Sequence, residues 1–343
     1  MVQKISIVIA CYNEAQNIPE LYTRVTKAFD QTSYPYELLF VDNASIDNSR
    51  TVYEQLVSAD PGVKALFMSR NFGTSQTSFF AGLQHATGDA VILIEGDLQD
   101  PPELIPKLIK KWKDGFDVVY AVRKKRRGTP VRKIFYKLFY MIFKWFSYLK
   151  IPVDAGDFSL LDRKVVNVIK KLPEKDIYIR GLRAWAGFKQ TGVEYVRDAR
   201  LHGQTSIKFF DNFSWFKKAI INFSYKPLEF ISKLTIIATL LTIIAAGIYL
   251  YFYFNTNMPR GFPTLLMVMF VFGTIQLLSL SIIGEYLIRM FQEIKGRPPY
   301  IISEVLQQKE TEPTNTVRPE CPPKLYAKGD VSRGRGIRTK DIS

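Results

Sequence analysis

The sequence predicts an α/β domain with a mostly parallel sheet, followed by a hairpin of two membrane-spanning helices. Two observations lead to this fold class. Over residues 1 to about 225, short apolar runs typical of strands alternate with helical stretches. Two uncharged apolar segments then follow, and each is long enough to cross the hydrocarbon core of a bilayer.

The expected strands are the apolar runs, and the expected helices lie between them. The strands are predicted at residues 5–10, 37–41, 63–68, 90–95 and 117–120. The helices are predicted at residues 17–29, 48–57, 75–85 and 104–113. Because strands alternate with helices, the connections are crossovers of the kind that join parallel strands. We expect this domain to cover residues 1–208.

The two membrane helices are predicted at residues 234–254 and 262–284, within a hairpin over residues 229–291. Neither segment contains a charged residue, and about 21 residues at 1.5 Å each span roughly 30 Å. The connecting loop carries one charged residue, Arg260, whereas Lys and Arg residues flank the outer ends of the hairpin. This asymmetry predicts an integral membrane protein whose termini and large domain are cytoplasmic. The alternative is a pair of buried helices in a large soluble core.

Two further segments mix aromatic residues with lysines, a composition that suits the headgroup layer of a membrane. The first covers residues 133–149, for which packing against the domain is an equal alternative. The second is a juxtamembrane helix at residues 209–228. Residues 292–343 are expected to form a cytoplasmic and mostly mobile tail. Exposed aromatic helices are also compatible with a homo-oligomer.

The net charge of +15 fits nucleic acid, anionic lipid or phosphorylated small molecules equally well. No helix-turn-helix, zinc-finger or RNA-recognition signature occurs, so no nucleic-acid partner is expected. The two cysteines, Cys11 and Cys321, lie far apart, which argues against a disulfide framework or a zinc site. The two histidines, His85 and His202, leave little with which to build a Ser-His-Asp triad.

A pair of carboxylates, Glu95 and Asp97, follows the apolar run at residues 90–95. Open α/β sheets bind ligands where their strands end. Two acidic residues placed there can coordinate one cation, and hard oxygen ligands favour Mg²⁺ or Mn²⁺, which also bind diphosphates. The alternative is that both side chains are ordinary solvated loop residues.

Several motifs resemble those of family 2 inverting glycosyltransferases, which have the GT-A fold. They are IVIACYNE at residues 7–14, VDNASIDNS at 41–49 and EGDLQDPP at 95–102. Within that family, SRNFG at 69–73, AGDFSLLDR at 155–163 and the apolar hairpin resemble the polyisoprenyl-phosphate glycosyltransferases of the GtrB and dolichol-phosphate mannose synthase types. The resemblance covers residues 4 to about 300 and implies a GT-A, Rossmann-like cytoplasmic domain.

The resemblance implies which side chains contact the nucleotide sugar and the metal. The nucleotide-sugar residues are Ala10, Tyr12, Glu14, Asp42, Glu95, Gln99 and Arg123. The metal residues are Asp97, Glu95 and Gln99. The family usually reads Asp-Asp-Gly-Ser where this chain has Asp42-Asn43-Ala44-Ser45, and it often has aspartate at the position of Glu95. Both departures weaken the match at those positions.

The resemblance also places Asp157 and Asp97 at the reacting centre, with Arg132, Arg200 and Lys208 at the acceptor phosphate. Guanidinium groups bind phosphate with two hydrogen bonds, which favours the arginines over Lys208. A lipid monophosphate is largely dianionic at pH 7 and attacks without a general base. We therefore expect Asp157 to orient substrate. A role as general base is one alternative, and a purely structural role as a helix N-cap is another.

The implied reaction is inverting transfer of a hexose, glucose from UDP-glucose by preference, to polyisoprenyl phosphate. GDP-mannose or a UDP-linked modified sugar is the alternative donor. In a bacterium the acceptor would be undecaprenyl phosphate and the location the inner (plasma) membrane. A processive polysaccharide synthase is disfavoured, because it needs many spanning helices and a Gln-x-x-Arg-Trp motif, to which the run at residues 180–185 is an imperfect match. The alternative of a different class is a non-enzymatic membrane scaffold.

Overall fold

The first five strands and the helices between them lie where the sequence places them. The computed structural model describes residues 3–124, 155–197, 226–255 and 261–308. The strands are β1 (Ile5–Cys11), β2 (Tyr36–Asp42), β3 (Val63–Met68), β4 (Ala90–Glu95), β5 (Val118–Arg123), β6 (Ala155–Asp162), β7 (Gln190–Tyr195) and β8 (Ile302–Leu306). The helices are α1 (Ile18–Asp30), α2 (Ser49–Ala59), α3 (Ser75–His85), the 3-10 turn η1 (Pro102–Leu104), α4 (Ile105–Lys113), α6 (Arg163–Lys171), α7 (Ile179–Ala186), α9 (Lys226–Asn255) and α10 (Phe262–Ile294).

All eight of these strands form one sheet in the order β7-β5-β6-β4-β1-β2-β3-β8. Parallel pairs join β1 to β2, β1 to β4, β2 to β3 and β5 to β7. β6 runs antiparallel between β4 and β5, and β8 runs antiparallel to β3. The prediction of an α/β fold with a mostly parallel sheet is confirmed.

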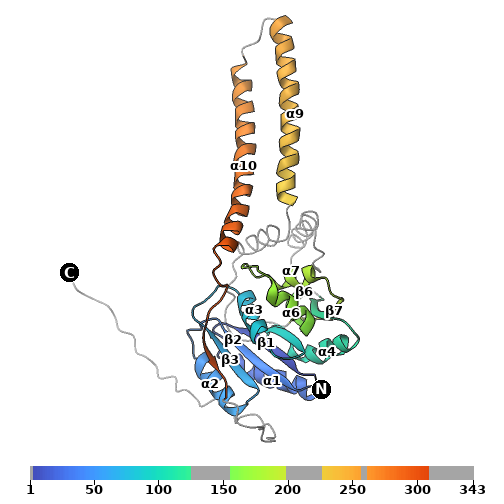
Figure 1. The fold of residues 1–343 in the computed structure, drawn as a ribbon, viewed down its shortest axis with the longest axis vertical. Coiled ribbons are helices and arrows are strands. Elements are labelled where there is room, and N and C mark those ends of the chain that lie inside the picture. Colours follow the sequence, from blue (N-terminus) through green and yellow to red (C-terminus); the bar gives the residue numbers. More distant parts are fainter. Residues whose placement is uncertain (1–2, 125–154, 198–225, 256–260, 309–343) are drawn as a thin grey trace, which may run out of the picture.

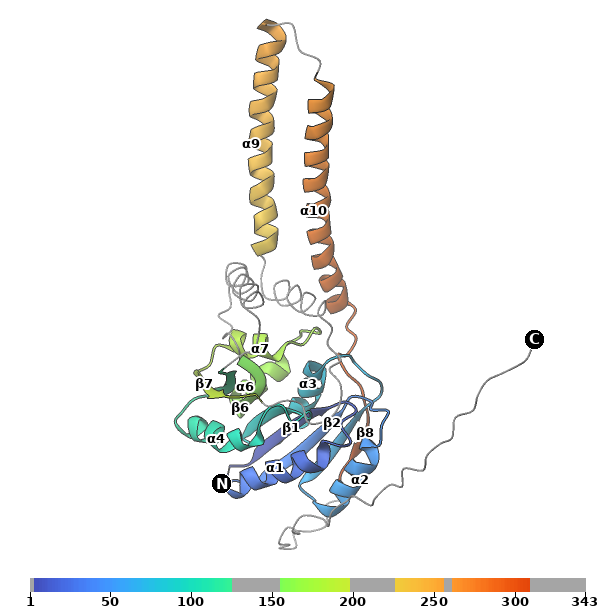
Figure 2. The same cartoon turned by 180° about the vertical axis from the view of Figure 1, so that it is seen from behind.

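Helices cover both faces of the sheet and bury one core on each side (Figure 1, Figure 2). On one face α1, α2 and α4 pack against strand residues such as Ile7 and Phe40. On the other face α3, α6 and α7 pack against residues such as Val8 and Leu39. Successive strand residues therefore alternate between two buried faces, which is why the strands read as continuous apolar runs in the sequence.

Three strands and two helices were not predicted, namely β6, β7, β8, α6 and α7. The unexpected edge strand is β8, which lies in the segment 292–343 expected to be mostly a tail. It pairs with β3, and Ser303 Oγ donates to the Phe67 carbonyl at 3.0 Å. Arg50 also binds Glu304 in β8 through two hydrogen bonds, at 2.9 and 2.8 Å. Residues 302–306 are thus part of the sheet of the α/β domain, held by contacts with residues more than 200 positions away in the chain.

Two long helices, α9 and α10, stand side by side and project away from the sheet domain (Figure 1, Figure 2). The predicted spans, residues 234–254 and 262–284, fall within them. In the part of the chain that the structure describes, one stretch, Val271–Ile294, passes a test of length and apolar composition for crossing a membrane. Large apolar side chains such as Ile244, Leu277 and Leu287 are exposed along both helices.

The C-terminal end of α10, which lies next to the sheet domain, is attached to that domain by polar contacts. Arg289 forms an ion pair with Asp176, and Glu293 Oε1 accepts a hydrogen bond from the Lys175 backbone N–H at 2.9 Å. Both partners lie just before α7. The predicted interfacial segments at 133–149 and at 209–225, the residues Arg132, Arg200 and Lys208, and the tail from residue 309 lie outside the described residues.

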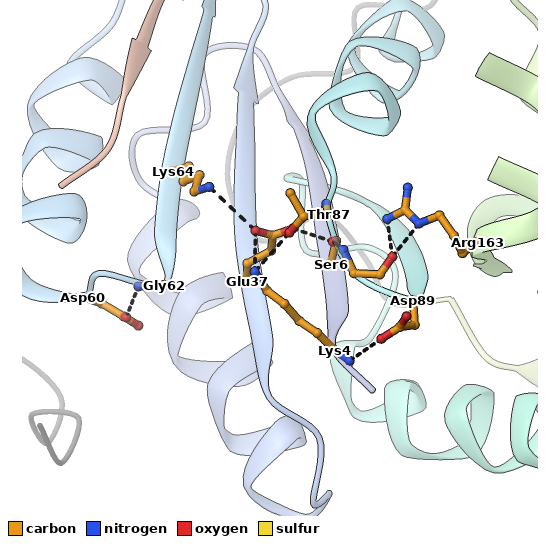
Figure 3. Close-up of polar contacts among 10 residues, drawn as sticks. Lys4, Ser6, Glu37, Asp60, Gly62, Lys64, Thr87, Asp89 and Arg163 are labelled. Atoms are coloured by element: carbon orange, nitrogen blue, oxygen red, sulfur yellow. Dashed lines mark hydrogen bonds and ion pairs between the residues drawn. The ribbon is translucent and has the colours of Figure 1, made fainter. Parts of the chain in front are cut away.

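Figure 3 shows a polar network around Glu37, near the beginnings of β1, β2 and β4. The Glu37 carboxylate, which is 2% exposed, accepts hydrogen bonds from Ser6 Oγ at 2.6 Å and from the Thr87 N–H at 2.8 Å. Lys4 Nζ lies 2.9 Å from its other oxygen. Burial alone would raise the pKa of Glu37, but these hydrogen bonds prevail and lower it to about 2. The network ties together the amino ends of these parallel strands.

Candidate active site

The candidate site lies at the carboxyl ends of the central parallel strands. Register places Ala10 beside both Val41 and Glu95, and Cys11 beside Asp42. The motifs that the sequence analysis singled out therefore meet at one edge of the sheet. This is the edge at which open parallel sheets bind ligands.

Three turns that follow these strands each contain a non-glycine residue in the left-handed region. Asn13, Ala44 and Leu98 have φ values of 56°, 58° and 56°. Such conformations are uncommon outside glycine and cluster at functional sites. The first two turns are joined, because the Asn13 N–H donates to Ser45 Oγ at 2.8 Å and the Ile46 N–H donates to Asn13 Oδ1 at 2.9 Å. The loops after β1 and β2 thus form one connected wall.

Three of the predicted nucleotide-sugar residues, Tyr12, Glu14 and Asp42, lie in or next to this wall. Asp42 is buried and accepts a hydrogen bond from the Ser45 N–H at 2.9 Å, while burial raises the pKa of its carboxyl. Tyr12 is 39% exposed, so its ring is available for contact with a ligand. Glu14 is buried and accepts a hydrogen bond from Asn17 at the start of α1. Glu14 therefore also fixes the path of the chain into α1.

Asn43, which replaces the second aspartate of the usual family motif, holds the loop after β3. Its Oδ1 accepts a hydrogen bond from the Phe72 N–H at 2.9 Å, and its Nδ2 donates to Asn71 Oδ1 at 3.2 Å. An aspartate could accept the first bond but has no N–H for the second. The asparagine is therefore matched to the SRNFG segment of this chain.

An acidic cluster follows β4. Arg197 lies among its carboxylates, with guanidinium nitrogens 3.6 Å from Glu95 Oε2, 3.9 Å from Asp97 Oδ2 and 3.5 Å from Asp100 Oδ1. Gly96 separates the first two acids because a side chain there would collide with β1: a Cβ would lie 2.7 Å from Cys11 Sγ. The Gly96 N–H donates to the Ala10 carbonyl at 2.9 Å, which holds the turn against β1.

Two hydrogen bonds through the Tyr195 hydroxyl connect the acidic cluster to Arg123. Arg123 Nε donates to the Tyr195 hydroxyl at 3.2 Å, and that hydroxyl donates to Asp100 Oδ1. Burial lowers the pKa of Arg123, but the contacts with Tyr195 and Asp100 outweigh it, so the net change is upward. Arg123 therefore stays cationic beside the acidic cluster, as phosphate binding requires.

Asp157 faces the cluster from β6. Extending the β4–β6 register beyond Leu93 and Ser159 brings it next to Glu95. Arg180 Nε and Nη2 donate to its two oxygens at 2.9 and 2.7 Å. Burial would raise the pKa of Asp157, but Arg180 outweighs it and the pKa is lowered. Asp157 lies inside a strand, so its alternative interpretation as a helix N-cap was wrong.

A second buried arginine supports this arrangement. Arg183 is fully buried, and its Nη2 donates to the Gly156 carbonyl at 3.0 Å. Its guanidinium carbon lies 5.1 Å from the centre of the Tyr120 ring. Burial lowers the pKa of Arg183 to about 10, which still leaves it charged at pH 7. Asp157 therefore lies in a positive environment.

Glu95 has the opposite environment. Burial, followed by the charges of Asp97, Asp157 and Asp100, raises the pKa of its carboxyl to about 7. Ser75 Oγ donates to Glu95 Oε1 at 3.1 Å. The neighbouring carboxylates thus make a negative charge on Glu95 unfavourable, and a cation bound beside it would relieve that repulsion.

Comparison with known proteins identifies the family. Residues 6–169 match the profile described as "Glycosyl transferase family 2". The chain is 43% identical over 301 residues to the uncharacterized glycosyltransferase YkcC of Bacillus subtilis, covering 87% of this chain and 93% of that protein. It is 38% identical over 305 residues to a prophage bactoprenol glucosyl transferase homolog of Escherichia coli, covering 88% and 99%. The chain belongs to glycosyl transferase family 2.

Another relative of this family 2 glycosyltransferase is the bactoprenol glucosyl transferase of Shigella phage SfII, which is 36% identical over 304 residues and covers 88% of this chain and 98% of that protein. Among solved structures, glucosyl-3-phosphoglycerate synthase of Mycobacterium tuberculosis superposes with a TM-score of 0.46 at 15% identity, covering 64% of this chain and 76% of that one. The family match and the sheet order together give the chain a GT-A fold.

The carboxylates of this family 2 glycosyltransferase fit a divalent cation that is shared with a diphosphate. In the ranges described, no group of three or more His, Cys, Asp or Glu side chains is arranged to hold a metal alone. Mg²⁺ is usually held by one or two carboxylates together with substrate phosphates and water, so no complete protein cage is needed. Asp97 and Glu95 supply such a pair, and the Gln99 N–H donates to Asp97 Oδ1 at 3.2 Å.

Sequence reasoning brought together Ala10, Asp42, Glu95, Asp97 and Asp157, and the structure places these residues at one edge of the sheet. It missed Asp100, Arg180, Arg183, Tyr195 and Arg197. Asp100 stood inside the EGDLQDPP motif, and Arg180 and Arg183 lie in the run compared with the processive-synthase motif, so local signals existed for these three. Tyr195 and Arg197 reach the site only through the pairing of β7 with β5, for which the sequence offers no local signal.

Proposed function

We propose that this enzyme transfers a hexose, with glucose from UDP-glucose as the expected donor, to a polyisoprenyl phosphate with inversion at the anomeric carbon. The observation that carries the proposal is the meeting of two kinds of group at one edge of the sheet. Glu95 at the end of β4 and Asp97 in the turn after it form a pair of carboxylates suited to a cation, and Asp157 on β6 is held by Arg180 of α7. The bactoprenol glucosyl transferases among the relatives support a polyisoprenyl acceptor.

Asp97 and Glu95, with Gln99 beside them, would hold Mg²⁺ or Mn²⁺ between the protein and the donor diphosphate. When bound, the cation offsets the charge that develops on the departing nucleoside diphosphate. Arg123 adds a permanent positive charge on the same side, since its pKa is raised. Ala10, Tyr12, Glu14 and Asp42 would surround the nucleotide, and Arg132, Arg200 and Lys208 would bind the acceptor phosphate.

Asp157 is suited to orienting a substrate hydroxyl or phosphate rather than to accepting a proton. Its two oxygens already accept hydrogen bonds from Arg180, and its pKa is lowered. A dianionic lipid phosphate needs no general base, because it is already a nucleophile at pH 7. Direct attack opposite the leaving group inverts the anomeric configuration, so an α-linked donor gives a β-linked product.

The proposed location is a bacterial inner membrane, with α9 and α10 spanning it and the catalytic domain on the cytoplasmic face. Exposed apolar side chains along both helices support this, because such a surface is unfavourable in water. The link from α10 to the loop before α7 would hold the site at a fixed distance from the bilayer. A long lipid acceptor can then stay in the membrane while its phosphate reaches the site.

Transfer of radiolabelled sugar to undecaprenyl phosphate tests the proposal. Purified full-length protein in detergent is incubated with UDP-glucose, or in parallel with GDP-mannose, and with Mg²⁺, Mn²⁺ or EDTA. We expect a metal-dependent lipid product from one donor, with a β linkage by NMR, and its loss in Asp97→Ala. An α-linked product contradicts inversion. Absence of lipid product from folded protein across a panel of donors favours the membrane-scaffold alternative.

A further inference from the structure

Arg197 is held in the acidic cluster in an unusual way. Its nitrogens lie 3.5 to 3.9 Å from three different carboxylates, beyond the normal range for an N–H···O hydrogen bond. Its Nε is buried and has no hydrogen-bond partner within the described ranges. The guanidinium thus lies among Glu95, Asp97 and Asp100 through charge attraction and not through fixed hydrogen bonds.

Other arginine–carboxylate pairs of this chain are closer. Arg180 binds Asp157 at 2.9 and 2.7 Å, and Arg24 binds Glu103 at 2.8 and 2.7 Å. Two-pronged contacts of that kind fix both partners. Among the residues that the structure describes, Arg197 makes no such two-pronged contact, so its position among the carboxylates is replaceable by another cation.

The charge of the cluster also leaves room for a further cation. Glu95, Asp97 and Asp100 are three acidic side chains, whereas two positive charges accompany them, from Arg197 and from Arg123, which is linked to Asp100 through the Tyr195 hydroxyl. A divalent cation coordinates carboxylate oxygens at about 2.0–2.2 Å, much closer than a guanidinium can approach. The broad guanidinium and a compact cation therefore compete for the same oxygens.

We propose that Arg197 is the built-in counter-cation of the metal site, displaced when the divalent cation binds and then paired with the donor diphosphate. The inference rests on the proposed function, because it takes the acidic cluster as the metal site. Arg197 follows the last residue of β7 by two positions, so its backbone remains beside the site while its long side chain changes partner. Its planar guanidinium is then matched to phosphate oxygens.

This arrangement couples metal binding to nucleotide binding. Without nucleotide, the metal must displace Arg197 and leave that charge without a partner. With nucleotide, the displaced guanidinium gains the diphosphate, so each ligand strengthens the binding of the other. Removing the Arg197 charge should therefore change the two binding steps in opposite directions, which a merely structural arginine would not do.

The test measures Mn²⁺ and UDP binding to full-length protein in detergent, by titration calorimetry and by electron paramagnetic resonance of free Mn²⁺. In Arg197→Gln we expect Mn²⁺ alone to bind on the order of tenfold tighter, and UDP at saturating Mn²⁺ to bind on the order of tenfold weaker. Arg24→Gln, which removes the arginine of the Arg24–Glu103 ion pair and leaves Glu95, Asp97 and Asp100 in place, should leave both values unchanged.

Arg197→Lys keeps the charge but loses the two-pronged donor, so it should bind Mn²⁺ alone like the wild type and bind UDP more weakly. This variant also carries the test if Arg197→Gln fails to fold. Weaker binding of both ligands, or no change in either, overturns the inference while leaving the proposed function intact. Failure of the wild type to take up Mn²⁺, even with UDP, instead contradicts the metal-dependent reaction itself and removes the inference with it.

Discussion

Arg180 donates two hydrogen bonds to Asp157, at 2.9 and 2.7 Å, and so joins the start of α7 to the first residues of β6. Gln76 of α3 lies beside the same carboxylate and also accepts a hydrogen bond from the Ile179 N–H at 2.9 Å. The start of α7, the start of α3 and β6 are thus fixed around one anion. An aspartate in this position is kept charged and oriented, which suits a residue that positions substrate.

Replacing Arg180 should show that the charge of Asp157 depends on this arginine. In Arg180→Gln the burial of Asp157 is offset only by Arg183 and Gln76, so its pKa should rise. We expect kcat to fall on the order of 10–100-fold and its acidic limb to move to higher pH. The measurement is kcat against pH from 5 to 9 for the wild type and the variant. An unchanged pH profile together with a lowered kcat would mean that Arg180 acts elsewhere.

Metal affinity should depend on pH through Glu95. Its pKa is raised to about 7, so at pH 6 the cation must displace a proton, and at pH 8 it need not. We expect the Mn²⁺ affinity to rise from pH 6 to pH 8, by up to about tenfold per unit below the pKa. Glu95→Gln should bind Mn²⁺ more weakly and with a flatter pH dependence. A wild-type affinity that is constant over this range contradicts the assignment of Glu95 as a ligand.

The raised pKa of Glu95 also affects the stability of the metal-free protein, which should fall with increasing pH where the metal affinity rises. Folded protein retains the Glu95 proton up to about pH 7, whereas the unfolded chain releases it near the ordinary glutamate pKa of 4.5. Stability should therefore fall as pH rises through this window. Thermal unfolding in EDTA at pH 5 and pH 8 measures it, and Glu95→Gln should show a smaller difference between the two temperatures.

Glu37 should make the opposite contribution at acid pH. Its pKa is lowered from 4.5 to about 2, so its stabilisation is present above pH 4.5 and is lost as pH falls toward 2. The shift corresponds to about 3 kcal/mol at neutral pH. Glu37→Gln should lower the unfolding temperature at pH 7, and the difference from wild type should shrink near pH 3. Glu54→Gln, at an exposed ion pair, is the matched control and should have little effect.

The sequence predicted the strands and helices whose pattern is visible within a short stretch of the chain. The strands β1 to β4 are apolar runs buried on both faces, and each is followed by a turn carrying a recognisable polar motif. β6 and β7 are interrupted by charged residues such as Asp157 and Glu194. β8 has only five residues and becomes a strand through its partner β3. Such elements depend on tertiary pairing, which a local pattern does not record.

The residues of the candidate site likewise fall into those that a local sequence pattern predicts and those that it does not. Carboxylates next to a strand end, such as Glu95 and Asp97, could be predicted because a parallel sheet brings its strand ends together. The cations that bind them could not, because Arg180 and Arg197 arrive from α7 and from the end of β7. Each arginine lies more than 20 positions from its acidic partner in the chain, among many other basic residues. Which arginine meets which acid is decided by packing.

Ala44 lies in the loop after β2, at the candidate site, and offers a test of protein stability. Its φ of 58° is strained for alanine, and glycine adopts this region without the clash of a Cβ. Glycine costs some entropy in the unfolded chain, so Ala44→Gly should have a net stabilising effect of roughly 0.5–1 kcal/mol. Ala59→Gly, at the last position of α2, should instead destabilise, because a helical position gains nothing from the conformational freedom of glycine. Thermal unfolding compares the two variants, and a loss of stability in both would show that the turn holding Ala44 carries no strain to relieve.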